Sequence, residues 1–197
     1  MKNISVVILA AGQAHRFGAH KILQRLPNNL SIIRQIVHIV LGAGFQKPII
    51  VTKEPDNMLH QELSDLDCVW ISNPDAHLGM STSLQKGIQN IPEDADAAMV
   101  VLADQPFITV ELLQKLTTEY NSTRLQIVYP LVHGKRSNPV ILDRTVFSAV
   151  MELRGDVGAR ALPPGFSVTI IDWPDKRLPL DVDTPADYER VLAEWSS

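Results

Sequence analysis

The sequence lacks several features that would assign it to a specialised class of proteins. It has one cysteine, Cys68, which excludes an intramolecular disulfide and a cluster of thiolate metal ligands. Its formal net charge of -4 provides no basic field that would attract nucleic acid or an anionic membrane. No apolar run approaches the roughly 20 residues that cross a bilayer, and the run over 4–11 is too short for a signal peptide. These absences predict a protein of the reducing cytoplasm.

What is present is typical of a globular domain. Hydrophobic residues make up 45% of the 197 residues and charged residues 20%, so the chain can bury a core without metals or disulfides. No repeat, low-complexity tract or flexible linker divides it. We therefore predict one domain over residues 1–197.

Short β-branched runs alternate with helical patterns along the chain. This alternation predicts an α/β fold, with a mainly parallel sheet covered by helices on both faces. The predicted strands span residues 4–9, 48–52, 68–72, 97–102, 126–131 and 167–172.

Four helices are marked by apolar spacing, and a last one by its start signals. Apolar residues recur at helical spacing in 31–41, after Thr109, in 84–88 and in 146–153. The last helix has Thr184 as N-cap, Pro185 at its first position and Asp187 where a capping box places an acid. In parallel sheets, ligands bind beyond the carboxyl ends of the strands, so the segments that leave strands are the candidates for chemistry.

The first such segment follows the first strand. Small residues at 10–12 allow backbone N–H groups to approach phosphate oxygens, and Arg16 and Lys21 add positive charge. The segment matches neither the P-loop nor the dinucleotide-binding glycine pattern. It indicates an anion cradle, and the alternative is a plain turn with two solvated cations.

Two further segments carry carboxylates. Asp104 follows an apolar strand directly, at a position suited to Mg²⁺, which prefers hard oxygen ligands. Its alternative role is to cap a turn before Pro106. Asp181 and Asp183 are separated by one residue, so both point to the same side while Val182 faces the core, and one of them can complete the metal site. Because a helix begins there, a purely structural role for Asp181 is an equal alternative.

A fourth segment, Gly79 to Leu84, begins a helix with three hydroxyl residues. Hydroxyls and N–H groups at a helix N-terminus suit an anion or the polar edge of a base. Helix capping explains the same residues equally well.

In combination, these segments resemble the MobA-like nucleotidyltransferases that complete the molybdenum cofactor. The resemblance is carried by Leu9-Ala10-Ala11-Gly12 with Arg16-Phe17-Gly18 and Lys21, by Leu102-Ala103-Asp104-Gln105-Pro106, and by Asp181-Val182-Asp183-Thr184-Pro185. Ala11, where guanylyltransferases usually have a second Gly, and the run Gly155 to Arg160 are similar to the cytidylyltransferase branch. Ser137 stands where a Gly is frequent before Asn138-Pro139, a departure that bears on the identity of the acceptor.

The resemblance implies a three-layer Rossmann-like domain of the nucleotide-diphospho-sugar transferase type and a set of site residues. It implies catalytic roles for Arg16, Lys21 and Asp104 and an Mg²⁺ cofactor on Asp104 and Asp183. Ser81 and Ser83 would lie near the base or ribose, and Asn138, Asp156 and Arg160 on the acceptor side. The implied nucleotide contacts are Leu9, Ala10, Ala11, Gly12, Arg16, Lys21, Ser81, Ser83 and Asp104.

The implied reaction transfers CMP from CTP to the phosphate of molybdopterin and releases pyrophosphate. One alternative keeps this chemistry with GTP as donor, or with a sugar or alditol phosphate as acceptor. Another is a module without turnover that binds nucleotide or cofactor and hands molybdenum cofactor to a partner hydroxylase. Replacing Asp104 with alanine would distinguish the enzyme from the module, because only a catalyst needs the metal site at Asp104.

Overall fold

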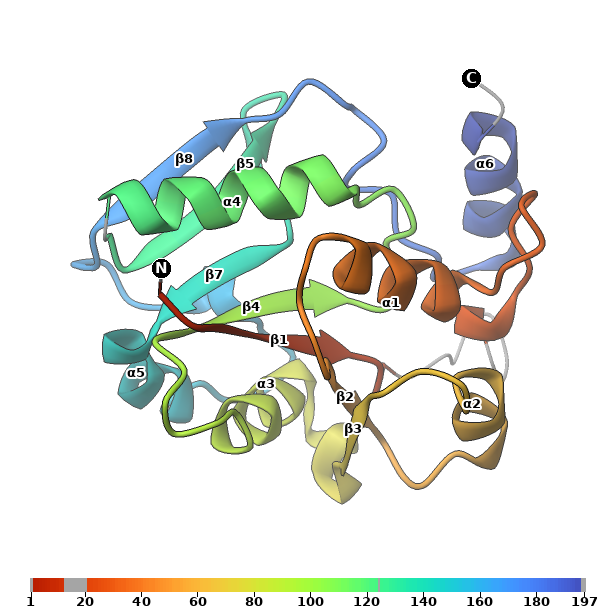
Figure 1. The fold of residues 1–197 in the computed structure, drawn as a ribbon, viewed down its shortest axis with the longest axis horizontal. Helices are drawn as coiled ribbons and strands as arrows, with labels where there is room; N and C mark the ends of the chain where they lie inside the picture. The colour runs from red at the N-terminus through yellow and green to blue at the C-terminus, as the bar shows by residue number, and fades with distance from the viewer. Residues whose placement is uncertain (1, 13–20, 124, 196–197) are drawn as a thin grey trace.

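The β-branched runs of the sequence form the strands of one eight-stranded sheet (Figure 1). The computed structural model describes residues 2–12, 21–123 and 125–195. All six predicted strands are confirmed to within one residue at each end, and two short strands are added. The strands are β1 (Ile4–Leu9), β2 (Ile49–Thr52), β3 (Val69–Ser72), β4 (Ala97–Leu102), β5 (Ile127–Val132), β6 (Lys135–Arg136), β7 (Val140–Asp143) and β8 (Val168–Asp172).

The sheet is mainly parallel, as predicted. Its strand order is β3-β2-β1-β4-β7-β5-β6, and β8 pairs with β5. β7 runs antiparallel to both of its neighbours, β4 and β5, and β6 runs antiparallel to β5. β6 and β7 were not predicted because they are short and flank residues 137–139, whose sequence is not typical of a strand.

The direction of chain progression reverses between β1 and β4. The chain passes from β1 outward through β2 and β3, and then returns to place β4 on the other side of β1. β1 and β4 pair in parallel from Ile4 opposite Ala97 to Leu9 opposite Leu102. Their carboxyl ends therefore lie side by side at the topological switch point, where ligands bind in open α/β sheets.

Helices cover both faces of the sheet and bury two apolar clusters (Figure 1). α1 (Ile32–Gly42) and α4 (Val110–Thr123) lie on one face, and α3 (Met80–Gln89) and α5 (Phe147–Met151) lie on the other. α2 (Asn57–Glu62) and α6 (Pro185–Trp195) lie toward the carboxyl ends of β1 and β4. Of the described helices, none is long and apolar enough to cross a bilayer.

The helix starts follow the signals in the sequence. The Ser31 side chain accepts a hydrogen bond from the Arg34 N–H at the start of α1. At α6, the Thr184 hydroxyl accepts from the Asp187 N–H at 3.2 Å and Asp187 accepts from the Thr184 N–H at 2.8 Å, which confirms the capping box. The helix predicted over 146–153 is shorter than expected: a 3-10 turn over Arg144–Val146 precedes α5.

Close packing holds α3 against the central strand. A Cβ atom at Gly87 would lie 2.3 Å from Cγ1 of Val7, far inside van der Waals contact. Only glycine at this position allows α3 to approach β1 so closely. The first turn of α3 is thereby fixed next to the end of β1, where the candidate site lies.

A polar network closes the opposite end of the sheet. The Asp143 carboxylate accepts hydrogen bonds from the Tyr120 hydroxyl at 2.6 Å and from the Lys2 ammonium at 3.0 Å. Burial alone would raise the pKa of Asp143, but hydrogen bonds from Tyr120, Thr145 and Lys2 outweigh burial and lower the pKa to about 2.

We expect this network to stabilise the protein only above the folded pKa of Asp143. Because the folded pKa is depressed, the contribution is fully present above about pH 4 and is lost as the pH falls toward 2. Asp143→Asn should therefore lower the free energy of unfolding at pH 7 by about 2 kcal/mol and flatten its acid dependence between pH 4 and 2, measured by urea unfolding. Asp67→Asn, which removes an exposed partner of Lys47, is the control and should change little. An equal loss in both variants would contradict the prediction.

Candidate active site

Backbone hydrogen bonds join the segments that leave β1, β2 and β4. The Ala10 N–H donates to the Val51 carbonyl at 2.8 Å, and the Ala103 N–H donates to the Leu9 carbonyl at 3.1 Å. The segment before α6 is added to this group, because the Val182 N–H donates to the Asp104 carbonyl at 3.0 Å. Four distant parts of the sequence therefore meet at the ends of β1, β2 and β4.

Lys21 lies at the centre of this meeting point. Its ammonium is 2.7 Å from Oδ2 of Asp104 and 2.7 Å from Oδ1 of Asp183. Lys21 is buried, whereas the side chain of Asp183 is 53% exposed. Burial alone would lower the pKa of Lys21, but the Asp104 and Asp183 carboxylates raise it. The lysine therefore stays charged and links the two acids across the crevice.

The side chains of Asp181 and Asp183 differ in their surroundings. Val182 between them is fully buried, as predicted. Asp183 lines the cavity described below, and Asp181 does not appear among the residues that line it. Partial desolvation, followed by repulsion from Asp183 and Asp104, raises the pKa of Asp181. Of the two acids, Asp183 is therefore the one in a position to share a ligand with Asp104.

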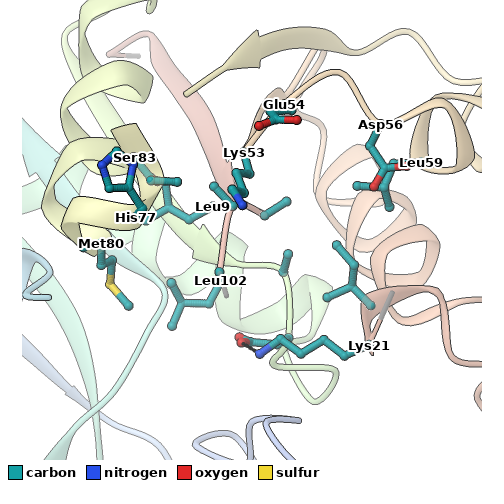
Figure 2. Close-up of a pocket in the computed structure, with 18 of the residues that line it drawn as sticks. Leu9, Lys21, Lys53, Glu54, Asp56, Leu59, His77, Met80, Ser83 and Leu102 are labelled. Atoms are coloured by element: carbon teal, nitrogen blue, oxygen red, sulfur yellow. Dashed lines mark hydrogen bonds and ion pairs between the residues drawn. The ribbon is translucent and has the colours of Figure 1, made fainter. Parts of the chain in front are cut away.

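A cavity of about 1080 Å³ opens above these charged residues. Figure 2 shows side chains entering it from several elements: Lys21 from below, Lys53 from the end of β2, and His77, Met80 and Ser83 from the region of α3. Its volume is at the upper end of the range for small-molecule sites. The cavity is large enough for a nucleotide together with part of a second substrate.

Most of the residues singled out in the sequence line this cavity. Those that do are Leu9, Ala10, Ala11, Gly12, Lys21, Ser83, Asp104, Asp156 and Asp183. Arg16 lies outside the residues that the structure describes. Asn138 and Arg160 line a smaller adjoining pocket. Ser81 lines a separate cavity of about 450 Å³, because successive residues of a helix point in different directions.

The N-terminus of α3 is closed by the loop at 155–156. The Ser81 N–H donates to the Gly155 carbonyl at 3.2 Å, and the Met80 N–H donates to the Asp156 carboxylate at 3.3 Å. Gly79 has a φ of 115°, and a Cβ atom on it would lie 2.3 Å from the backbone of Gly155. The described structure therefore partners these N–H groups within the protein instead of leaving them for an anion.

Ser83 is held by a buried asparagine. Asn73 lies at the end of β3 and donates from Nδ2 to the hydroxyls of Thr82 and Ser83, both at 2.9 Å. Because the Ser83 hydroxyl accepts this bond, it can donate its own hydrogen to a ligand in the cavity. Asn73 was not selected from the sequence, where a lone Asn before Pro74 indicates only a turn.

The segment that follows β2 also contributes to the cavity and was not predicted from the sequence. Lys53, Glu54 and Asp56 line the cavity, and Asp56 lies on the side away from Ser83 and His77 (Figure 2). The signal was available, because this segment follows Thr52 at the carboxyl end of a parallel strand. It was overlooked because its composition resembles an ordinary solvated turn.

Asp104 and Asp183 have the chemistry that a divalent cation requires. Both present a carboxylate oxygen to one point, now held by the Lys21 ammonium. Across the described ranges, no cluster of three or more His, Cys, Asp or Glu side chains could hold a metal by itself. Mg²⁺ is usually bound by one or two carboxylates together with water and substrate phosphates, so the two acids fit that mode of binding.

Comparison with known sequences identifies the family. Residues 6–164 match the model of the MobA-like NTP transferase domain, so the chain belongs to this family of nucleotidyltransferases. Asp183 and α6 lie beyond the matched range.

Curated relatives are distant and differ in length. The chain is 29% identical over 160 residues to DEAD-box ATP-dependent RNA helicase 26 of rice, of which it spans only 27%. It is 26% identical to a probable molybdenum cofactor guanylyltransferase of Natranaerobius thermophilus, over 67% of this chain and 62% of the relative. Purine catabolism protein PucB of Bacillus subtilis is 24% identical, with 96% of each chain covered.

Solved structures share the fold over nearly the whole chain. Rv0371c of Mycobacterium tuberculosis has a TM-score of 0.86 at 23% identity, with 98% of each chain covered, and a manganese complex of it is also known. Its homologue from Mycobacterium sp. strain JC1 has a TM-score of 0.82 at 27% identity, with 97% of this chain and 96% of that chain covered. A CMP:2-keto-3-deoxy-manno-octonic acid synthetase solved with CTP has a TM-score of 0.77 at 15% identity, with 99% of each chain covered. The nucleotide-diphospho-sugar transferase type of fold is thereby confirmed.

Lys21 should compete with a divalent cation for the two carboxylates. Lys21→Met removes the ammonium, so we expect Mn²⁺ to bind the nucleotide-free protein about tenfold more tightly, measured by electron paramagnetic resonance. Lys53→Met is the matched control, since Lys53 lines the same cavity without an ion pair to a described acid. Equal Mn²⁺ affinity in all three proteins would show that the lysine and the metal do not share the site.

Proposed function

We propose that this protein is an Mg²⁺-dependent cytidylyltransferase. It transfers CMP from CTP to the phosphate of molybdopterin and releases pyrophosphate. Residues 1–197 act as one nucleotidyltransferase domain in the cytoplasm, where the unpaired Cys68 stays reduced.

The convergence of Lys21, Asp104 and Asp183 carries this proposal. These residues come from three separate segments and meet within 2.7 Å at the switch point of the sheet, in a cavity of sufficient volume. A structural ion pair does not require a lysine shared by two acids at the mouth of a cavity. Nucleotidyl transfer does require opposite charges there, because it brings two phosphates together.

The charges of the site suit the chemistry of the transfer. The acceptor phosphate and the α-phosphate of the nucleotide repel each other, and the leaving pyrophosphate gains negative charge. Mg²⁺ held by Asp104 and Asp183 would offset this charge and orient the phosphates. When a metal takes the place of its ammonium between the two acids, Lys21 can turn to the phosphates as a second cation, and the backbone at 10–12 can approach the phosphates closely. The acceptor phosphate is already ionised near neutral pH, so no general base is needed.

The choice of donor and acceptor rests on the resemblance in sequence. Ala11, buried in the cavity wall, is the residue that favours CTP over GTP. The guanylyltransferase relative supports molybdopterin as acceptor, and the synthetase neighbour supports CTP as a donor that this fold can hold. A sugar or alditol phosphate is the competing acceptor, because the transfer requires only an acceptor that carries a phosphate.

Pyrophosphate release measures both choices at once. With CTP, GTP, ATP and UTP tested against molybdopterin and sugar phosphates, we expect release above background only with CTP and molybdopterin. Asp104→Ala should reduce this rate by about 100-fold or more while the protein stays folded. Asp94→Ala, an exposed acid bonded to Asn3, is the control. Activity only with a sugar phosphate would refute the proposed acceptor, and cofactor delivery that survives Asp104→Ala would favour a carrier without turnover.

Ala11 offers a separate test of base choice. Ala11→Gly restores the glycine typical of guanylyltransferases, so the ratio of kcat/KM for CTP to that for GTP should fall by about tenfold. Ala10→Gly, at a neighbouring position that also lines the cavity, should lower this ratio much less. An unchanged ratio in Ala11→Gly would place base selection elsewhere in the cavity.

A further inference from the structure

A small pocket of about 40 Å³ adjoins the nucleotide cavity on the side of β7. Leu9, Met80 and Leu102 line both spaces, so the two adjoin at these side chains. Four of its lining residues are polar or charged, namely Arg136, Ser137, Asn138 and Arg160. The sequence analysis placed Asn138 and Arg160 on the acceptor side and assigned no role to Arg136.

Arg136 is held in place at this pocket. Its guanidinium lies 4.3 Å from the centre of the Tyr129 ring, and one of its N–H groups donates to the Ala159 carbonyl at 3.3 Å. These contacts fix the plane of the guanidinium and use few of its five donors. The remaining donors are available to a ligand.

The lining of the pocket carries positive charge from two arginines. No described acidic side chain lines it, and no described carboxylate forms an ion pair with Arg136 or Arg160. Burial, and in addition repulsion from Arg160, lower the pKa of Arg136. Two arginines close enough to repel each other are stabilised when an anion binds between them.

A buried hydroxyl beside the arginines has no partner. Ser137 is only 8% exposed, and its Oγ has no hydrogen bond in the described structure. The Ser137 N–H donates to the Pro130 carbonyl at 2.9 Å, which fixes the residue at the pocket wall. A buried hydroxyl without a partner is costly, and a ligand oxygen in the pocket would satisfy it.

We propose that Arg136, Ser137 and Arg160 bind the phosphate group of the acceptor. The two guanidinium groups supply charge and paired N–H donors, and the hydroxyl supplies a third donor of fixed direction. An acceptor phosphate bound here lies next to Leu9 and Leu102, which also line the nucleotide cavity, so it can face the α-phosphate of the nucleotide. This site rests on the proposed function for its role, and its binding chemistry can be tested without turnover.

Inorganic phosphate is the probe, and saturating α,β-methylene-CTP with Mg²⁺ keeps it out of the nucleotide site. In amide NMR spectra of the intact protein, phosphate should shift the signals of residues 136–138 and 158–160. Arg136→Gln and Arg160→Gln should each weaken phosphate binding by about tenfold. Arg136→Lys keeps the charge and should lose less, and Arg190→Gln, an exposed arginine of α6, should bind phosphate normally.

Thermal unfolding of each variant checks its fold. Because Arg160 is exposed and makes no hydrogen bond to another described residue, Arg160→Gln keeps the test valid even if Arg136→Gln unfolds. Unchanged phosphate affinity in Arg160→Gln, or no amide shifts at 136–138 in the natural sequence, would overturn the site. If phosphate binds as expected but no nucleotide binds, the anion site stands and the proposed transferase function fails.

Discussion

The parallel pairing of β1 with β4 is the constraint on which the rest of the site depends. The two strands match residue for residue over six positions, so the chain leaves both at the same level. The first departing segment brings Ala10 to Gly12, and the second brings Ala103 and Asp104. The carbonyl of Asp104 then fixes Val182, which sets Asp183 opposite. A shift of one residue between β1 and β4 would separate these groups and reverse the faces of every side chain in one strand.

Electrostatic balance explains why the charged centre can be partly buried. An unpaired ammonium group as buried as that of Lys21 would destabilise the folded protein. Two carboxylates facing each other without a cation would repel each other. Together the three groups compensate one another's charge. Lysine between Asp104 and Asp183 also means that the acids are already in place before any metal binds. The protein thus holds the site in a form close to what phosphates require.

The sequence predicts local features better than pairings across the chain. Strands such as 97–102 and the cap at Thr184 are visible because their signals lie within a few residues. β7 becomes a strand of the sheet by pairing with β4 and β5, which are remote in the sequence from one another. Nothing local in Val140–Asp143 indicates that it runs antiparallel to both. In the site, Asp104 was found because it follows a buried strand. Arg136 was not found, because its contacts with the Tyr129 ring and the Ala159 carbonyl depend on the pairing of β5 with β6 and on the position of the 159 loop.

The contact between Gly79 and Gly155 links two parts of the molecule to which we assign different substrates. Gly79 begins the helix that carries Ser83 to the nucleotide cavity, and Gly155 begins the loop that leads to Arg160. A Cβ atom on Gly79 would lie 2.3 Å from the backbone of Gly155, so Gly79 accepts no side chain unless Gly155 moves. Gly155 itself has a φ of 80°, a conformation that favours glycine. Substitutions in the 155–160 loop that change the preferred acceptor therefore also affect the part of the cavity that holds the donor. A lineage that changes one substrate must either keep both glycines or change the start of α3 and the 155–160 loop together.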